Sequence, residues 1–245
     1  MTSPRLHLVW LVSLVALTAS PQAQSSNKYL EVPPPDQAVS SPAYRYANMT
    51  NEQALAEVTR RGIRFEHATP PLPGVRLPIR LTAPLRGVTI RSSLPEPERK
   101  DTPFDIMDAR LALALDDFCR ILQMHDIVEV IHFTIYRPPT TVPDDPKAPQ
   151  TRHPAGMAID VGALKRSDGH WLAVGPHWSS SIGARTCGPQ GRRLVGRRGR
   201  ELLSILCEAG DQRIFHYMLS PHFDEPHSDH LHLEIKPGVK WFLYN

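Results

Sequence analysis

Two widely separated stretches of the chain carry residues that could bind a metal ion. The first, residues 151–162, reads TRHPAGMAIDVG and places His153 and Asp160 seven positions apart, with small or apolar residues around them. One imidazole and one carboxylate are two of the three protein ligands that a catalytic zinc ion takes, while water occupies the fourth position. The third ligand must therefore come from elsewhere in the chain.

The second stretch, residues 227–235, reads HSDHLHLEI and offers that third ligand. Alternate residues of a strand share a face. In a strand here, His230 and His232 would point to one side and Leu231 and Leu233 to the other. We expect two imidazoles bracketed by buried leucines to form the wall of a site.

These motifs together resemble the zinc peptidase superfamily of the D-alanyl-D-alanine carboxypeptidases, the lysostaphin-type endopeptidases and the hedgehog amino-terminal domain. Residues 219–234, LSPHFDEPHSDHLHLE, most resemble the bacterial extensin-like C-terminal domain family, and the penicillin-insensitive murein endopeptidases are also similar. The resemblance covers the chain from about residue 104 to its end. It implies an α+β fold, with a long helix on one face of a central antiparallel sheet and a zinc cleft on the other.

By this resemblance, Zn²⁺ would be held by His153, Asp160 and His232, and the metal would activate a water for attack on a peptide carbonyl. A base must then take the proton from that water. Strand geometry favours His230, whereas the carboxypeptidase branch has an acid three positions before the last histidine ligand, which here is Asp229. We keep His230 and Asp229 as joint candidates, with His227 as a third residue of the wall.

Arg137 is the candidate for stabilising negative charge on the substrate. It follows an apolar, β-branched stretch, residues 128–136, which we predict to be a strand, and two prolines come directly after it. The carboxypeptidase branch has a similar Tyr-Arg pair at a strand end, so Arg137 would hold the carbonyl oxygen as charge develops on it. The alternative is a solvated arginine at the end of a strand.

The start of the chain predicts export. Residues 1–23 combine Arg5, an apolar run and small residues, which is typical of a cleaved secretory signal peptide. Export, the zinc motifs and the resemblance together suggest a periplasmic or secreted peptidase that hydrolyses peptide bonds of peptidoglycan stem peptides or cross-links. The alternative is a metal-containing module that binds the cell wall without turnover.

Composition is that of a soluble globular protein. The 245 residues are 41% hydrophobic and carry a formal net charge of +3. Basic residues between 192 and 200 are interleaved with glycine and not with aromatic residues, so we expect no nucleic-acid partner. These residues could form a solvated loop. Alternatively, they could form a positively charged rim of the site that attracts anionic cell-wall polymer. We expect a monomer with no membrane span after signal cleavage.

Three cysteines are present, and export permits a disulfide. Cys119 falls in an apolar helical stretch and is most simply a buried thiol. We predict a bridge between Cys187 and Cys207.

The remaining elements divide the chain into the signal (1–23), an N-terminal linker or arm (24–100) and the peptidase-like domain (101–245). In the arm we predict a helix over 51–61 capped by Thr50, and edge strands or extended segments within 75–92. The domain should contain its main helix over 105–125, a hairpin over 161–174, a helix over 201–209 and a strand within 212–219.

Overall fold

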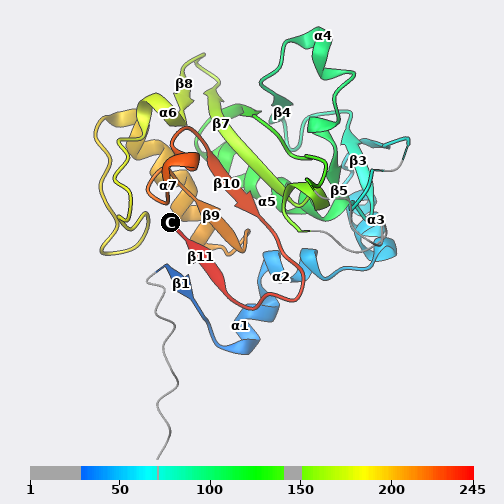
Figure 1. Ribbon diagram of the computed structural model, residues 1–245, viewed down its shortest axis with the longest axis horizontal. Coiled ribbons are helices and arrows are strands. Elements are labelled where there is room, and N and C mark those ends of the chain that lie inside the picture. The colour runs from blue at the N-terminus through cyan, green and yellow to red at the C-terminus, as the bar shows by residue number, and fades with distance from the viewer. Residues whose placement is uncertain (1–28, 71, 141–150) are drawn as a thin grey trace, which may run out of the picture.

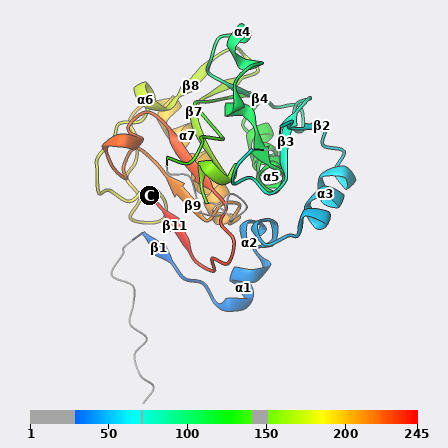
Figure 2. The ribbon, with the colours of Figure 1, turned by 45° about the vertical axis from the view of Figure 1, so that its right-hand side comes forward.

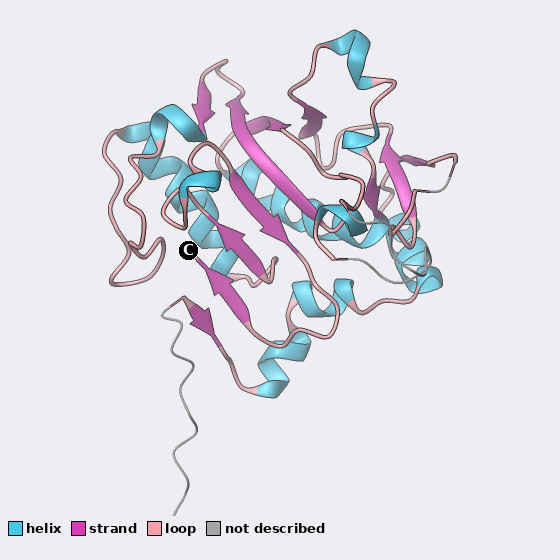
Figure 3. Cartoon of the chain, viewed as in Figure 1, coloured by secondary structure: helices cyan, strands magenta, loops and turns pink. Residues whose placement is uncertain are grey.

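The computed structural model describes residues 29–70, 72–140 and 151–245. The predicted signal peptide and all but the first residue of the polar loop at 140–150 lie outside these residues. The fold is α+β, as expected: a large mixed sheet, a smaller three-stranded sheet and several helices (Figures 1 and 3). Among the described residues, helices long and apolar enough to cross a membrane are absent.

The main sheet has eight strands. Their order is β1-β11-β9-β10-β7-β6-β4, with β8 paired to β7. The bounds are β1 Leu30–Glu31, β4 Thr89–Ser92, β6 Ile127–His132, β7 Ala158–Arg166, β8 Trp171–Ala173, β9 Tyr217–Leu219, β10 Leu231–Glu234 and β11 Phe242–Tyr244.

The expectation of a purely antiparallel sheet is wrong. The strands from β9 through β10 and β7 to β6 are antiparallel, but β11 runs parallel to β9 and β4 runs parallel to β6. A parallel pair needs a long crossover connection, usually a helix. The chain between β4 and β6 contains one, α5 (Ala109–Met124).

Helix α5 lies behind the main sheet in the view of Figure 1 and contacts β6. It begins four residues later than predicted because Asp108 caps it, accepting a hydrogen bond from the backbone N–H of Arg110. Residues Pro103–Asp105 form a separate 3₁₀ turn, η1, ahead of it. Most of α5 is buried, including the free thiol of Cys119.

The second sheet consists of β2 (Phe65–His67), β3 (Pro78–Leu81) and β5 (Met107–Asp108). It lies beside α5, on the side of the molecule where α3 is found (Figure 2). We predicted an edge strand for β3, but it is the middle strand. Its proline is tolerated because Pro78 is the first residue of the strand.

The N-terminal region packs on the rest of the chain through three helices and also contributes strands to both sheets. Its helices are α1 (Pro35–Ser40), α2 (Pro42–Ala47) and α3 (Asn51–Arg60). α3 has the predicted cap: the Thr50 side chain accepts from the N–H of Gln53, whose own side chain accepts from the N–H of Thr50. Tyr46 of α2 is buried in the common core.

The remaining helices are α4 (Glu96–Arg99), α6 (Val174–His177) and α7 (Arg197–Asp211), with 3₁₀ turns η2 (His153–Ala155) and η3 (Glu225–His227). α7 starts earlier than the helix predicted from residue 201, so part of the basic run lies in its first turn and not in a loop. The hairpin of β7 and β8 and the Cys187–Cys207 disulfide are confirmed. The strand predicted to reach Tyr136 ends at His132, where a register shift against β7 interrupts it.

Candidate metal centre

Asp160 and His232 face each other across the antiparallel pair of β7 and β10. Directly opposed residues share one face of a sheet. The two side chains therefore meet, with His232 Nδ1 3.0 Å from Asp160 Oδ1. Leu231 and Leu233 point to the other side and are buried in the core, as the alternation predicts.

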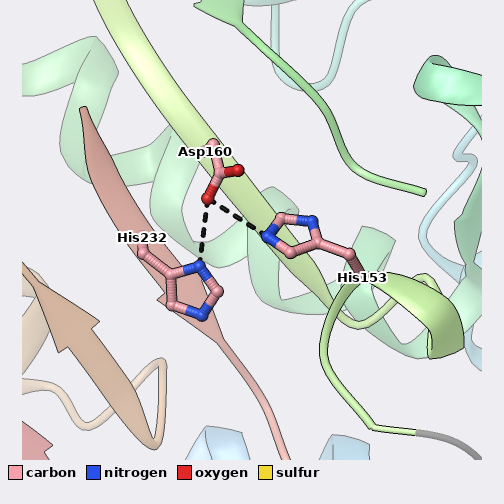
Figure 4. A group of neighbouring side chains, drawn as sticks. All are labelled: His153, Asp160 and His232. Carbon is pink, nitrogen blue, oxygen red and sulfur yellow. Dashed lines mark hydrogen bonds and ion pairs between the residues drawn. The ribbon is translucent and has the colours of Figure 1, made fainter. Parts of the chain in front are cut away.

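His153 reaches the same carboxylate oxygen from the 3₁₀ turn η2. Its Nε2 lies 3.2 Å from Asp160 Oδ1 (Figure 4). Its Nδ1 lies 2.8 Å from the carbonyl oxygen of Ile135, which can only accept, so Nδ1 carries the proton. Gly156 ends the turn in a left-handed conformation (φ 63°), where a Cβ would lie only 2.8 Å from the Asp108 nitrogen. Glycine is thus required for the end of η2 to approach the backbone of β5 this closely.

These three side chains form a group that could hold a metal ion. Their ligand atoms all lie within 4.8 Å of one another, and all three residues are buried. In neutral His153 the Nε2 lone pair faces the carboxylate oxygen, and this nitrogen makes no well-aligned hydrogen bond among the described residues. Two electron-rich atoms turned toward each other fit a cation between them, so the donor set suits a divalent metal.

The electrostatics of the group also favour an anionic Asp160. Burial by itself would raise the pKa of Asp160, but the close contacts of its carboxylate with the His153 and His232 imidazoles outweigh burial and hold that pKa well below its usual range. For His232, burial lowers the pKa, whereas the hydrogen bonds with Asp160 and Glu234 raise it to a net value above normal. The raised pKa favours a second proton on the His232 ring when no metal is bound, and a metal ion would take the place of that proton.

A pocket opens above the group, lined also by Arg137, His227 and His230. His230 Nε2 lies 3.5 Å from Asp160 Oδ1, and Arg137 Nη2 lies 3.6 Å from Asp160 Oδ2. A Cβ at Gly162 would lie 2.6 Å from the ring of Phe133. Glycine therefore lets that ring lie against β7, 5.9 Å from the His230 ring.

Asp229 is the one predicted site residue outside the pocket lining. Its side chain is 61% exposed, and its Oδ1 lies 2.9 Å from His230 Nδ1. Asp229 therefore contacts the group through His230. His170, at the far end of the hairpin, pairs with Asp168 and lies outside the site.

His227 stands on η3 with its Nδ1 paired to Asp224. Its ring centre is 5.2 Å from that of His230 and 5.9 Å from that of His232. Burial lowers the pKa of His227, against the opposing effect of Asp224. His227 is thus a wall residue, as expected, that favours its neutral form.

The sequence reasoning missed Glu234 and Arg152. Glu234 is fully buried, with Oε2 3.3 Å from His232 Nε2, and Arg152 Nε lies 3.6 Å from the same oxygen. The alternation that groups His230 with His232 continues to residue 234, so that signal could have identified Glu234. Arg152 had no comparable signal beyond its position directly before His153.

Comparison with known protein families matches residues 111–242 to the family described as extensin-like protein C-terminus. No curated protein and no solved structure matches the chain. The matched segment includes every residue of the candidate metal centre and of its pocket wall, and it covers more than half of the sequence. The chain therefore belongs to the extensin-like C-terminal family.

Proposed function

We propose that this protein is a zinc-dependent peptidase that hydrolyses peptide bonds of peptidoglycan stem peptides or cross-links outside the cytoplasm. The observation that carries the proposal is the convergence of His153, Asp160 and His232 at the base of a pocket. Two imidazoles and one carboxylate are a donor set of catalytic zinc sites. The likeness of these motifs to the zinc peptidase superfamily, the family membership and the signal-like first residues support the substrate class and the location.

When bound, Zn²⁺ would supply Lewis-acid chemistry, polarising a carbonyl and lowering the pKa of a water toward about 7. The wall of the pocket supplies the remaining chemistry. His230 projects Nε2 toward the group, while Asp229 accepts a hydrogen bond from Nδ1–H. This pair can take a proton from the attacking water at Nε2 and return it to the leaving amine.

Arg137 lies near the other oxygen of the Asp160 carboxylate. Its Nη2 is 3.6 Å from Oδ2, whereas His230 lies near Oδ1. The Arg137 side chain is 56% exposed, so the guanidinium is accessible to a substrate. A fixed cation at this place would stabilise the negative charge that develops on the carbonyl oxygen during attack. Arg137 and Arg152, both in the pocket lining, would also attract the carboxylates of stem peptides.

Metal analysis of the purified protein, followed by digestion of purified sacculi, tests the proposal. We expect about one Zn²⁺ per chain and release of new amino groups, which a chelator abolishes and added Zn²⁺ restores. His153→Ala and His232→Ala should lose both the metal and the activity. His170→Ala, which changes an exposed histidine outside the site, is the matched control and should keep both.

Retention of the full metal content by both ligand variants would show that the assignment is wrong. If the protein binds sacculi and metal but releases no amines, the cell-wall binding module replaces the peptidase as the function of this site.

A further inference from the structure

Glu234 is a buried carboxylate without an assigned role in the proposed site. It lies on β10 two residues after His232, on the same face of the strand, and is 0% exposed. Oε2 lies 3.3 Å from His232 Nε2, and Oε1 has no hydrogen-bond partner among the described residues. Removing a carboxylate from water costs several kcal/mol unless it is paired and hydrogen-bonded. A short apolar residue at position 234 would avoid that cost. A buried acid at this position therefore suggests a role beyond packing.

The cation next to Glu234 comes from a strained turn. Arg152 has φ 59° and ψ −139°, a strained conformation that residues other than glycine rarely adopt. Its carbonyl oxygen accepts from the backbone N–H groups of Ala155 and Met157, which hold it there. In this conformation Arg152 Nε lies 3.6 Å from Glu234 Oε2, and the next residue is His153. One turn therefore places both a candidate ligand and the countercharge for Glu234.

The two ring nitrogens of His232 then have distinct partners. Nδ1 faces Asp160 and Nε2 faces Glu234. A carboxylate that accepts from one ring N–H fixes the tautomer and the orientation of a metal-binding imidazole. With the proton on Nε2, the Nδ1 lone pair is directed at the position between His153 and Asp160.

We infer that Glu234 is a positioning residue of the metal centre, which holds His232 as the Nε2–H tautomer with Nδ1 free for the metal, and that Arg152 balances its charge. This inference rests on the proposed metal site. It assigns to Glu234 an effect on metal affinity as well as on folding.

The variant Glu234→Gln tests it, because the amide keeps the size of the side chain and an acceptor oxygen but removes the charge. Using the full chain, we expect zinc affinity, measured by competition with a chromogenic chelator, to fall about 10- to 100-fold. The visible absorption spectrum of the Co²⁺-loaded protein should also change. Glu225→Gln, at an exposed acid on η3, is the control and should leave affinity and spectrum unaltered.

A second measurement needs no variant. Long-range ¹H–¹⁵N spectra of the zinc-loaded wild-type protein should show His232 protonated at Nε2 and coordinated at Nδ1. The opposite tautomer would overturn the inference. So would a Glu234→Gln protein with altered melting temperature but wild-type zinc affinity and Co²⁺ spectrum, since that result defines a purely structural acid.

Failure of the inference and failure of the proposed function give different results. If the wild-type protein binds zinc and digests sacculi while Glu234→Gln binds zinc equally well, only the role of Glu234 is wrong. If the wild-type protein binds no zinc, both are wrong.

Discussion

At the scale of single residues, register and distance to Asp160 distinguish His232 from His230. His232 lies directly opposite Asp160, so its ring meets that carboxylate. His230 shares the same side but precedes the first residue of β10, and its Nε2 is farther from Asp160 Oδ1, at 3.5 Å. Asp229 lies in the turn ahead of β10, and its side chain is largely exposed. The alternative in which a bend brings Asp229 to the metal position is absent from this structure, where Asp229 acts on the group only through His230.

This arrangement predicts that substitutions of His230 and Asp229 lower activity to different extents. His230→Ala should lower the rate of sacculus digestion about 10²- to 10⁴-fold, the usual contribution of a general base, with zinc content unchanged. Asp229→Asn should have a smaller effect because it removes only the partner that orients the imidazole. Stopped assays of amine release together with metal analysis measure both. Loss of zinc from His230→Ala would instead make His230 a ligand.

At the scale of elements, local signals predicted the existence of helices and strands better than their ends. Thr50 and Gln53 lie within one turn of each other, so the sequence itself contains the start of α3. The start of α5 depends on Asp108, whose other carboxylate oxygen accepts from the N–H of Leu77, a residue far away in the sequence. The end of β6 depends on its register against β7.

The segment that joins β10 to β11 is held by His216, just before β9. Its ring Nε2 lies 3.0 Å from the Val239 carbonyl oxygen and its Nδ1 accepts from the N–H of Lys236. The ring stacks on Phe242 at 5.6 Å. Only the neutral imidazole with its proton on Nε2 satisfies both contacts. Burial accordingly lowers the pKa of His216 to about 4, despite the hydrogen bond with Val239.

We therefore predict that His216 makes the fold sensitive to acid. Its folded-state pKa of about 4 lies below the ordinary value of 6.5, so between these pH values the unfolded chain binds the proton more readily. The free energy of unfolding should fall by about 3 kcal/mol as the pH falls through this window. Urea denaturation at several pH values measures it, with His216→Asn as the comparison. Equal pH dependence in the two proteins would contradict the assignment.

At the scale of the whole molecule, the N-terminal helices share the core of the part of the chain that carries the candidate metal centre. Arg61, at the end of α3, binds Asp116 and Asp117 of α5 and also the hydroxyl of Tyr46. Burial and the contact with Asp117 raise the pKa of Tyr46 to about 12, so the hydroxyl stays protonated. This buried polar network ties three helices together across the sequence.

Two neighbouring arginines provide a matched test of that coupling. The Arg61 side chain is 12% exposed, whereas the Arg60 side chain is 71% exposed and binds Glu57 alone. Arg61→Met should lower the free energy of unfolding by about 1.5–3 kcal/mol because Asp116 and Asp117 lose a shared charged hydrogen-bond partner, while Asp116 keeps Arg86 and Asp117 keeps the Tyr46 hydroxyl. Arg60→Met should lower it by less than about 1 kcal/mol. Denaturation midpoints and slopes measure the free energy of unfolding of both variants. Similar losses of stability would mean that the network does not stabilise the packing of the N-terminal helices.

Features that depend on neighbours along the chain can be predicted from the amino-acid residues alone. The alternation of residues 230–233, the cap at Thr50 and the apolar spacing of α5 act over a few positions, and each is visible in the printed letters. The candidate ligands His153, Asp160 and His232 were identified in this way, together with the resemblance of their motifs to a known family.

Contacts between residues far apart in the sequence depend on how the whole chain folds. Asp160 and His232 are 72 positions apart, and their contact depends on the register of β7 against β10. Burial on both faces of the sheet fixes that register, since a slip by one residue would turn His232 into the core and Leu231 toward the pocket. The parallel pairs of the sheet and the contact of Arg152 with Glu234 likewise join residues that no local pattern connects.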